Sequence, residues 1–541
     1  MHLGLDFDNT LACYDITFAQ AAKQRGLVPE YWSGGKRALR DYLRNQKEDG
    51  ELAWQTLQGY VYGELMPQAR LKPGAGWFLL YCKARGIQVS IVSHKTEYSQ
   101  KDPKRIPLRE VAREWMTQVG FFDPNRYKIS PEAVYFESTR HAKVERIHAL
   151  GCTHFVDDLP EVLGHEGFSA EIKKILYDPE AKGHYLSESI SAYSSWRLIG
   201  EALLGAETEA DLLSLAQDLL PDFDVKGCQP ASGGGNSRVY KVSLHNGSTF
   251  ALKRYSEVLS YDRDRLGTEV AACRLLHNHG LDRVPVVIRK DVDNQIGVFE
   301  WIKGNIPASP TSENLSQLLA FVAQLNGLRE SKALTQLSNA TEACLSGQEI
   351  CRQIQIRRDR FTEFKIKYSD IANFLETIFD PLFPQVVDWS KCHWPQNPLF
   401  NEALPVERQT LSPSDLGFHN AIWGESGNLH VIDLEYFGWD DPVKLASDFW
   451  WHPGMALDHQ LRKRWIKEVT NIFHQDEAFS ARLYAAHPLY GLRWAMIVLK
   501  PFMSNDAIHK ASAIAVQEQL GKSIDLCQCV TRWIGDENPK F

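Results

Sequence analysis

Neither an excess of positive charge nor a long hydrophobic run occurs in this sequence. Its 541 residues include 60 Lys and Arg against 68 Asp and Glu, which gives a net charge of −8, and they form no long basic tract. A protein dedicated to nucleic acid needs many cations to neutralise phosphates, so this balance argues against nucleic acid as a partner. No segment approaches the about 18 consecutive apolar residues that cross a bilayer, and a membrane protein is therefore not expected.

Cysteines are few and scattered. The 10 cysteines form no dense framework, and the close pair Cys527 and Cys529 lacks the second pair that a zinc site needs. We interpret them as free thiols in a reducing compartment. The first residues enter a strand directly, without the basic segment, apolar stretch and cleavage site of a secretory leader. These observations predict a cytoplasmic protein and leave its oligomeric state open.

Short apolar segments alternate with helical stretches in the first part of the chain. The predicted strands cover residues 2–7, 88–92, 134–136, 153–156 and 174–177, and the predicted helices cover 76–85, 107–119 and 139–150. Strands that alternate with helices indicate a parallel sheet covered on both faces. The intervening segment 14–72 is mostly helical and rich in aromatic residues.

The pattern changes after an acidic, helical stretch over residues 186–220. Residues 227–255 are typical of antiparallel hairpin strands around a glycine-rich turn, and a helix is predicted over 263–278. Strands near 285–301 and a mostly helical remainder complete the chain. Because 541 residues are too many for one core, we predict two domains, residues 1–204 and residues 205–541.

Two carboxylates directly follow the first predicted strand. The segment Asp6-Phe7-Asp8-Asn9-Thr10 comes after Leu3-Gly4-Leu5, at the edge where open parallel sheets place ligands. Asp6 can attack phosphorus when a divalent cation screens the charges, and Asp8 can protonate the leaving oxygen. An Asp-x-Asp pair alone also fits an ordinary surface turn, so the later strands have to supply the context.

Polar residues follow the later strands in the same order along the chain. Ser93 ends the second strand and can donate to a phosphoryl oxygen. Lys143, in the helix after the third strand, can neutralise developing charge, and Lys95 and Arg140 are its rivals for this role. Asp157-Asp158 ends the fourth strand and can hold Mg²⁺ through hard oxygen ligands. Chance rarely produces four such groups in this order.

These motifs resemble those of the haloacid dehalogenase superfamily of phosphatases, over roughly residues 1–200. The resemblance implies that Asp6 is the nucleophile and Asp8 the general acid/base. It also implies that Ser93 and Lys143 bind the phosphoryl group, and that Mg²⁺ is held by Asp6, Asp8 and Asp157. The predicted fold class of residues 1–204 is then α/β, a Rossmann-like parallel sheet with a helical cap over 14–72.

The second half carries residues suited to nucleotide binding. A glycine-rich turn joins two predicted strands and lets backbone N–H groups approach phosphates through Gly233, Gly234 and Gly235. Lys253 on the next strand can pair with nucleotide phosphates, and Glu269 on the following helix can hold it as an ion pair. Glu300 and Ile302 lie in the connection between the predicted lobes, where backbone groups can face adenine.

An Asp-x₄-Asn motif and a strand-end aspartate follow much later. Asp415 can orient and deprotonate an acceptor hydroxyl, and Asn420, five residues on, can coordinate Mg²⁺. Asp433 closes a strand and can chelate the metal that bridges the phosphates. With Lys253 and Glu269 upstream, this arrangement is typical of ATP-dependent transfer to a hydroxyl.

These residues resemble the aminoglycoside/choline phosphotransferase family over roughly residues 225–541. The resemblance implies a protein-kinase-like α+β fold for residues 205–541, with ATP and Mg²⁺ as cofactors. The sequence departs from the family's His-Gly-Asp, because Pro413-Ser414 precedes Asp415. The missing histidine normally buttresses the catalytic loop, so the rigidity of this loop is in question.

Three further features have competing interpretations. Gly521-Lys522-Ser523 imitates the end of a Walker A loop, but Val516 stands where that motif requires glycine, and a helix is predicted there. Asp440 fits either a metal pair with Asp441 or a solvated turn. Arg493 fits either a site for an anionic acceptor or, with its aromatic neighbours, a buried helix face.

Together the motifs predict a bifunctional enzyme, a Mg²⁺-dependent phosphatase joined to an ATP-dependent kinase. Its substrates would be a small phosphorylated metabolite and a hydroxyl acceptor such as a sugar or amino alcohol. Two alternatives remain at this stage. One is an enzyme that processes nucleic-acid ends, and the other is a chain in which one domain is inactive and serves as a regulatory or binding scaffold.

Overall fold

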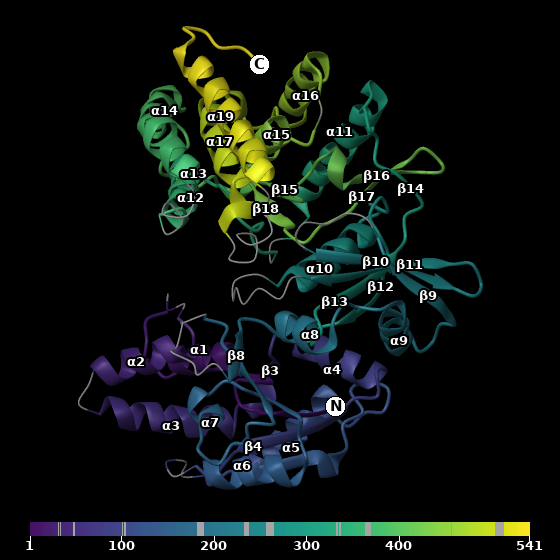
Figure 1. Cartoon of the computed structure of the whole chain (residues 1–541). Coiled ribbons are helices and arrows are strands. Elements are labelled where there is room, and N and C mark those ends of the chain that lie inside the picture. Colours follow the sequence, from purple (N-terminus) through teal and green to yellow (C-terminus); the bar gives the residue numbers. More distant parts are fainter. Residues whose placement is uncertain are drawn as a thin grey trace. The chain divides into compact units, whose positions relative to one another are not determined.

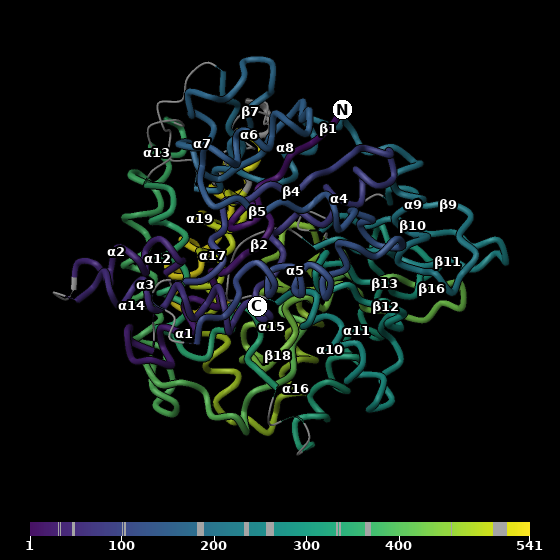
Figure 2. Tube along the Cα trace, turned by 90° about the horizontal axis from the view of Figure 1, so that it is seen from below, coloured from purple at the N-terminus to yellow at the C-terminus, as the bar shows by residue number. Residues whose placement is uncertain are grey.

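The computed structural model of the chain describes two compact units (Figures 1 and 2). Unit 1 comprises Met1–Leu266 and Ile288–Trp301, and unit 2 comprises Gly267–Val287 and Ile302–Phe541. The described residues are all of 1–541 except 31, 33, 47–48, 100, 102–103, 181–188, 232–236, 256–263, 332–333, 335–336, 363–368, 456 and 504–512.

Unit 1 contains a six-stranded parallel sheet in the order β5-β4-β1-β6-β7-β8. Its strands are β1 (His2–Leu5), β4 (Gln88–His94), β5 (Val134–Glu137), β6 (His154–Asp157), β7 (Lys173–Tyr177) and β8 (Ile190–Tyr193). The helices between them are α4 (Ala75–Ala84), α5 (Leu108–Val119), α6 (Arg140–Ala149) and α7 (Pro160–Leu163), and α8 (Trp196–Leu204) follows β8. The predicted parallel sheet is therefore present, and the fully buried β1 lies between β4 and β6, which brings the ends of three strands together.

One strand of this sheet contradicts the prediction of a helical stretch from residue 186. β8 adds to the edge of the sheet beside β7, and α8 begins only at Trp196. The two central residues of β8, Ser191 and Ala192, are exposed, so the segment has none of the apolar alternation that marks a half-buried strand.

A helical insert interrupts the sheet after β1. It contains α1 (Asp15–Gln24), α2 (Lys36–Gln46) and α3 (Gly50–Tyr62), as the sequence predicts for residues 14–72. The short strands β2 (Ala12–Cys13) and β3 (Arg70–Leu71) pair antiparallel at its two ends. The insert therefore leaves and rejoins the sheet region at one point, directly after the motif that contains Asp6 and Asp8.

Unit 1 also contains a five-stranded sheet in the order β12-β13-β11-β10-β9. Its strands are β9 (Val225–Pro230), β10 (Ser237–Leu244), β11 (Thr249–Tyr255), β12 (Val287–Asp291) and β13 (Ile296–Glu300), and α9 (Glu209–Leu219) packs on β9. The predicted antiparallel hairpins are present in β9, β10 and β11. One hydrophobic core runs from Leu3 in the parallel sheet to Val298 in the antiparallel sheet, so apolar burial joins the two sheets.

Polar contacts centred on Glu207 reinforce this shared core. The Glu207 carboxylate accepts hydrogen bonds from Tyr81 Oη at 2.7 Å, from Tyr240 Oη at 3.0 Å and from Arg254 Nη1 at 3.1 Å. The Arg254 guanidinium lies 3.9 Å from the ring centroid of Trp77 on α4. One carboxylate thus connects the parallel-sheet region to the strands of the antiparallel sheet.

Replacing Glu207 with glutamine should loosen unit 1, because it removes one carboxylate charge from beside the buried Arg254. Losing one partner of a buried ion pair costs about 3–5 kcal/mol, and the partial exposure of Glu207 reduces the expected loss of unfolding free energy to about 1–3 kcal/mol. Hydrogen–deuterium exchange should show faster exchange in α4 and β11. The matched control is Glu166→Gln at an exposed position, and equal exchange in the two variants would contradict the bracing role.

Unit 2 is mostly helical, as predicted for the C-terminal part. Its helices are most of α10 (Arg265–Asn278), α11 (Ser312–Gly327), α12 (Gly347–Arg360), α13 (Ser369–Phe374), α14 (Asp380–His393), α15 (Pro442–Trp451), α16 (His459–Ile472), α17 (Phe479–Val498) and α19 (Ala513–Gly535). Its short strands are β14 (Gly304–Asn305), β15 (Thr410–Ser412), β16 (Ala421–Gly424), β17 (Leu429–Val431) and β18 (Gly438–Asp440). The central α17 packs against α12, α14, α15 and α19, and α17 and α19 lie side by side in Figures 1 and 2.

No helix in the described part of the chain combines the length and the apolar character that spanning a bilayer requires. Gly521-Lys522-Ser523 lies within α19, so the helix predicted in place of a Walker A loop is present.

Candidate functional site

Four predicted residues of unit 1 meet at the carboxyl ends of three neighbouring parallel strands. Asp6 follows β1, Ser93 lies in β4 and Asp157 ends β6. Ser93 Oγ donates to Asp6 Oδ1 at 3.0 Å, and Lys143 Nζ on α6 contacts Asp6 Oδ1 at 2.5 Å and Asp157 Oδ2 at 2.6 Å. All four side chains are buried. Lys143, rather than Lys95, is the lysine that joins the Asp6 and Asp157 carboxylates.

A third carboxylate completes an all-oxygen cluster. Ligand atoms of Asp6, Asp157 and Asp158 lie within 4.8 Å of one another, and Thr10 Oγ1 donates to Asp158 Oδ1 at 3.3 Å. Burial, together with the charges of Asp157 and Asp6, raises the pKa of Asp158 to about 8. Burial also raises the pKa of Asp157 to about 6, against the opposing charge of Lys143. Three hard oxygen donors with this unfavourable charge density fit a divalent cation such as Mg²⁺.

Asp8 is held by residues that the sequence did not single out for this contact. Lys95 Nζ lies 2.9 Å from both carboxylate oxygens of Asp8, and Tyr14 Oη donates to Asp8 Oδ1 at 2.5 Å. Lys95 is buried, and its charge compensates Asp8 rather than Asp6 and Asp157. The roles of Asp8 as acid/base and as metal ligand stay predictions, because its carboxylate lies outside the described three-carboxylate cluster.

The structure describes only some of the residues that are predicted to bind the nucleotide. Gly233, Gly234 and Gly235 lie outside the described residues. Lys253 is a buried residue of β11, 4.9 Å from the ring centroid of Tyr255, and Glu300 ends β13. Lys253 and Glu300 belong to unit 1, whereas Glu269 and Ile302 belong to unit 2. The predicted Lys253–Glu269 ion pair and the adenine contacts stay predictions.

The Asp-x₄-Asn motif forms a compact loop in unit 2. Asn420 Nδ2 donates to the Asp415 backbone oxygen at 2.9 Å and to Asp415 Oδ2 at 3.3 Å. His419 Nε2 lies 3.1 Å from Asp415 Oδ1, and its ring stacks on His452 with centroids 4.1 Å apart. The structure therefore joins the predicted base Asp415 to the predicted ligand Asn420 and adds two histidines.

The charges and hydrogen bonds around Asp415 keep its carboxylate able to accept a proton. Burial pushes the pKa of Asp415 upward, but the hydrogen bond and charge of His419 outweigh it and hold this pKa below its usual range. Burial and the neighbouring His419 lower the pKa of His452 to about 4, so His452 is neutral near pH 7. Asp415 is then ionised at neutral pH, as a base must be.

Asp433 lies in a second all-oxygen cluster, which is in unit 2. Ligand atoms of Glu269, Asp433 and Glu435 lie within 4.8 Å of one another, and Glu269 and Glu435 are buried. The backbone links this cluster to the Asp415 loop, since Ile432 N donates to the Asn420 backbone oxygen at 2.9 Å. Glu435 is a candidate ligand that the sequence analysis missed. Its place two residues after Asp433 was the available signal.

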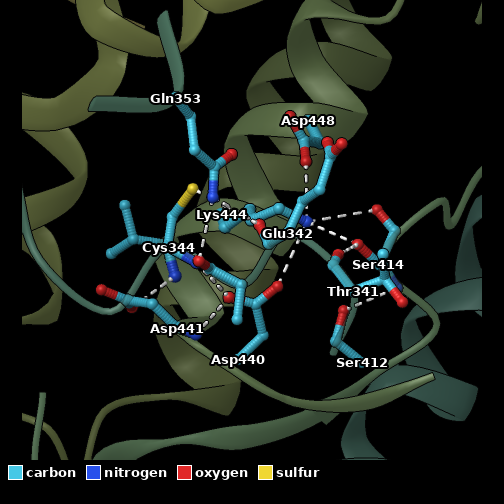
Figure 3. A network of polar contacts seen from close by, with 12 residues as sticks. Thr341, Glu342, Cys344, Gln353, Ser412, Ser414, Asp440, Asp441, Lys444 and Asp448 are labelled. Carbon is cyan, nitrogen blue, oxygen red and sulfur yellow. Dashed lines mark hydrogen bonds and ion pairs between the residues drawn. The ribbon is translucent and has the colours of Figure 1, made fainter. Parts of the chain in front are cut away.

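Buried Lys444 holds the loop before Asp415, where the sequence lacks the histidine of the His-Gly-Asp motif. Lys444 Nζ donates to Ser414 Oγ at 2.7 Å and pairs with Asp440 at 3.1 Å and Asp448 at 3.2 Å (Figure 3). Ser414 Oγ donates in turn to the Thr341 backbone oxygen at 3.2 Å. Ser414 has a φ of 66°, an uncommon conformation for a residue with a side chain, which surrounding contacts must hold. The loop before Asp415 is thus fixed without the histidine of the related family.

Two open interpretations are settled by burial. Asp440 is fully buried and accepts from the backbone nitrogens of Cys344 at 3.0 Å and Asp441 at 2.9 Å, so the solvated turn is wrong. Arg493 is buried and contacts Asp448 at 3.2 Å and Glu342 at 3.1 Å. It therefore belongs to the same structural network and lies on a buried helix face.

Replacing Ser414 with alanine tests the brace. The change removes the bonds to Lys444 and Thr341 but keeps Asp415, so we expect phosphate transfer to fall about tenfold with little loss of stability. The measurement is transfer from ATP at saturating concentration, next to thermal unfolding. Ser447→Ala, which truncates a buried serine on α15, is the control, and equal rates in the two variants would refute the bracing role.

Comparison with solved structures gives similar chains of low sequence identity. An ADP-bound aminoglycoside phosphotransferase has 13% identity and a TM-score of 0.40, and the match covers 59% of this chain and 98% of that one. A choline kinase from Streptococcus pneumoniae has 13% identity and a TM-score of 0.40, with 58% and 98% covered. An ethanolamine kinase from Plasmodium vivax has 14% identity and a TM-score of 0.42, with 62% and 95% covered.

The comparison with curated protein sequences gave no match. A protein-family model does match, over residues 227–483, and it describes the phosphotransferase enzyme family. The matched segment contains Lys253, Glu269, Asp415, Asn420 and Asp433. The resemblance to haloacid dehalogenase phosphatases stays a prediction for the N-terminal part. Residues 227–483 are thus similar to the phosphotransferase enzyme family.

Proposed function

We propose that the chain is a bifunctional enzyme that removes phosphate from one small metabolite and transfers phosphate from ATP to a hydroxyl of another. The convergence of Asp6, Ser93, Lys143 and Asp157 at one sheet edge supports the phosphatase. The family match and the loop that joins Asp415 to Asn420 support the kinase. Two acidic clusters, one for each reaction, support Mg²⁺ as a shared requirement.

In the phosphatase reaction, an Asp6 oxygen attacks phosphorus while the ester P–O bond breaks. Ser93 and Lys143 hold the equatorial oxygens and balance their charge, and Asp8 gives a proton to the leaving oxygen. Asp8 then takes a proton from water, whose oxygen attacks phosphorus and releases inorganic phosphate and free Asp6. A divalent cation held by Asp6, Asp157 and Asp158 would screen the carboxylate from the phosphoryl charge.

In the kinase reaction, Asp415 accepts the proton of the acceptor hydroxyl, and the hydroxyl oxygen attacks the γ-phosphorus of ATP. The bond to the β-phosphate oxygen breaks, and ADP leaves. Asn420 and His419 hold Asp415 in position through the contacts described above. Asp433, with Glu269 and Glu435, would hold the cation that neutralises the phosphates.

The test is a pair of assays on the purified full chain with Mg²⁺. One assay follows phosphate release from phosphomonoesters, and the other follows transfer of labelled phosphate from ATP to sugars and amino alcohols. We expect turnover in both, and a chelator should stop both. Absence of phosphate release would refute the phosphatase half, and absence of ATP-dependent transfer across the acceptor panel would refute the kinase half.

A further inference from the structure

A cavity of about 830 Å³ opens beside the carboxylate cluster of unit 1. Asn9 and Asp158 line its catalytic end, and residues of the helical insert line one wall. Pockets of about 300–1,000 Å³ accommodate whole small-molecule ligands, whereas a phosphoryl group alone needs far less. The cavity therefore has room for the leaving group of a substantial phosphate ester.

Helix α2 supplies this wall with a row of cations. Lys36, Arg40 and Arg44 all line the cavity, and their spacing of four residues places them on one face of the helix. At 1.5 Å per residue, Arg40 lies about 6 Å and Arg44 about 12 Å along the helix from Lys36. The row begins at the catalytic end, since Lys36 Nζ donates to Asn9 Oδ1 at 2.8 Å.

At the near end of the row, the charge of Lys36 has neutral hydrogen-bond partners. Its Nζ contacts Asn9 Oδ1 and also Tyr62 Oη, the latter at 2.6 Å. Asn9 itself has a φ of 64° and directly follows Asp8. The carboxylates of Asp158, Asp8 and Asp15 also act on this half-buried cation, and a phosphoryl group bound at Asp6 would add to the anions that stabilise it.

At the far end, the two arginines pair with exposed carboxylates. Arg40 pairs with Asp41 at 2.9 Å, Arg44 donates two hydrogen bonds to Glu51, and all four side chains are at least one-third exposed. Because solvent screens such exposed pairs, a ligand anion can compete with Asp41 and Glu51 for the two guanidinium groups. An incoming phosphate or carboxylate would gain bidentate, charge-assisted hydrogen bonds from the guanidinium groups.

Another part of the lining carries carboxylates. It includes Glu161, Asp178 and Glu180, from the segments after β6 and β7, and Glu180 lies 4.0 Å from Arg37 of α2. Acidic groups there repel a ligand anion and direct it toward α2. The lining thus carries cations on α2 and carboxylates on the segments after β6 and β7, which favours one orientation of a charged ligand.

We propose that the phosphatase substrate carries a second anionic group, a phosphate or a carboxylate, which binds to Arg40 and Arg44 while the scissile phosphoryl group lies at Asp6. This assignment rests on the proposed phosphatase function. It names the substrate class as a phosphate ester with a second anion about 6–12 Å along the molecule, the span of the α2 row. A hexose bisphosphate and a phosphorylated sugar acid are the two chemical sources of such an anion.

The experiment compares substrates in the full chain and in the double variant Arg40→Gln/Arg44→Gln. For a hexose bisphosphate, the kcat/KM relative to that for p-nitrophenyl phosphate should fall about 10- to 100-fold in the variant. A phosphorylated sugar acid, tested in parallel, shows whether a carboxylate serves as the second anion. The control Lys23→Gln/Lys173→Gln removes the same charge outside the cavity and should leave the ratio unchanged. Equal ratios in the double variant and the wild type would overturn the proposal.

Binding without turnover separates this proposal from the phosphatase assignment. Calorimetry on Asp6→Asn should show the hexose bisphosphate binding more tightly than the hexose monophosphate, and the arginine substitutions should abolish the difference. Equal affinity for both ligands in Asp6→Asn overturns the second-anion site. Tighter bisphosphate binding in a chain that hydrolyses no phosphomonoester supports the site and overturns only the phosphatase.

Discussion

Asp6→Asn should abolish phosphate release from phosphomonoesters. Asparagine has nearly the same shape, but its amide cannot form the acyl-phosphate bond, and loss of a nucleophile costs on the order of 10⁴- to 10⁶-fold in rate. The buried Lys143 keeps Asp157 as a partner in the variant, so the fold should survive. Phosphate release at saturating substrate and Mg²⁺ measures the loss, and circular dichroism checks the fold.

The proposed kinase activity is the internal control for Asp6→Asn. Transfer of phosphate from ATP should persist in Asp6→Asn, because Asp415, Asn420 and Asp433 all belong to unit 2. Glu166→Gln, an exposed substitution in unit 1, should leave both activities intact. An Asp6→Asn protein that keeps more than about one-hundredth of the phosphatase rate would show that another group attacks phosphorus.

Asp415→Asn should have the corresponding effect on the kinase. The variant keeps side-chain volume but loses the oxygen charge that accepts the hydroxyl proton, and loss of a general base costs about 10²- to 10⁴-fold. Because the change acts on the chemical step, kcat should fall while the KM for ATP stays close to that of the wild type. Transfer of labelled phosphate from ATP to the acceptor measures both constants.

His419 is the alternative candidate for the base that Asp415 is predicted to be. His419 Nε2 lies 3.1 Å from Asp415 Oδ1, so in Asp415→Asn the imidazole is a neighbouring group that can accept a proton. If the variant retains wild-type transfer and His419→Ala abolishes it, His419 is the base and the role of Asp415 is wrong. The exposed substitution Glu477→Gln in unit 2 is the matched control for loss of one negative charge.

Local pattern predicted the framework on which both candidate sites lie. The apolar run before Asp6 and the β-branched run before Ser93 indicated buried parallel strands, whose carboxyl ends lie at a common edge. That rule predicts that Asp6, Ser93 and Asp157 lie close together, as they do in the fold. The family match over residues 227–483 confirms the phosphotransferase resemblance of the C-terminal part. The catalytic and binding roles themselves stay predictions.

Contacts between distant segments could not be predicted in the same way. Tyr14 and Lys36 reach the site from the helical insert, and a sequence pattern does not specify where such side chains end. Lys444 lies 30 residues beyond Ser414, and only the packing of α15 brings the two together. Lys143 and Lys95 were equivalent as charges along the chain, and their different carboxylate partners follow from the tertiary fold.

The core common to both sheets of unit 1 has a consequence for any attempt to separate the two halves of the protein. Trp77 Nε1 donates to the Asn294 backbone oxygen at 3.0 Å, and Tyr127 Oη donates to Asn294 Oδ1 at 3.0 Å. A fragment that begins at residue 205 would lose both aromatic donors and would expose the apolar underside of its own sheet to water. Truncation would therefore yield a protein that aggregates through its exposed apolar surface. Inactivity of such a fragment would then reflect misfolding and would not test the proposed kinase reaction.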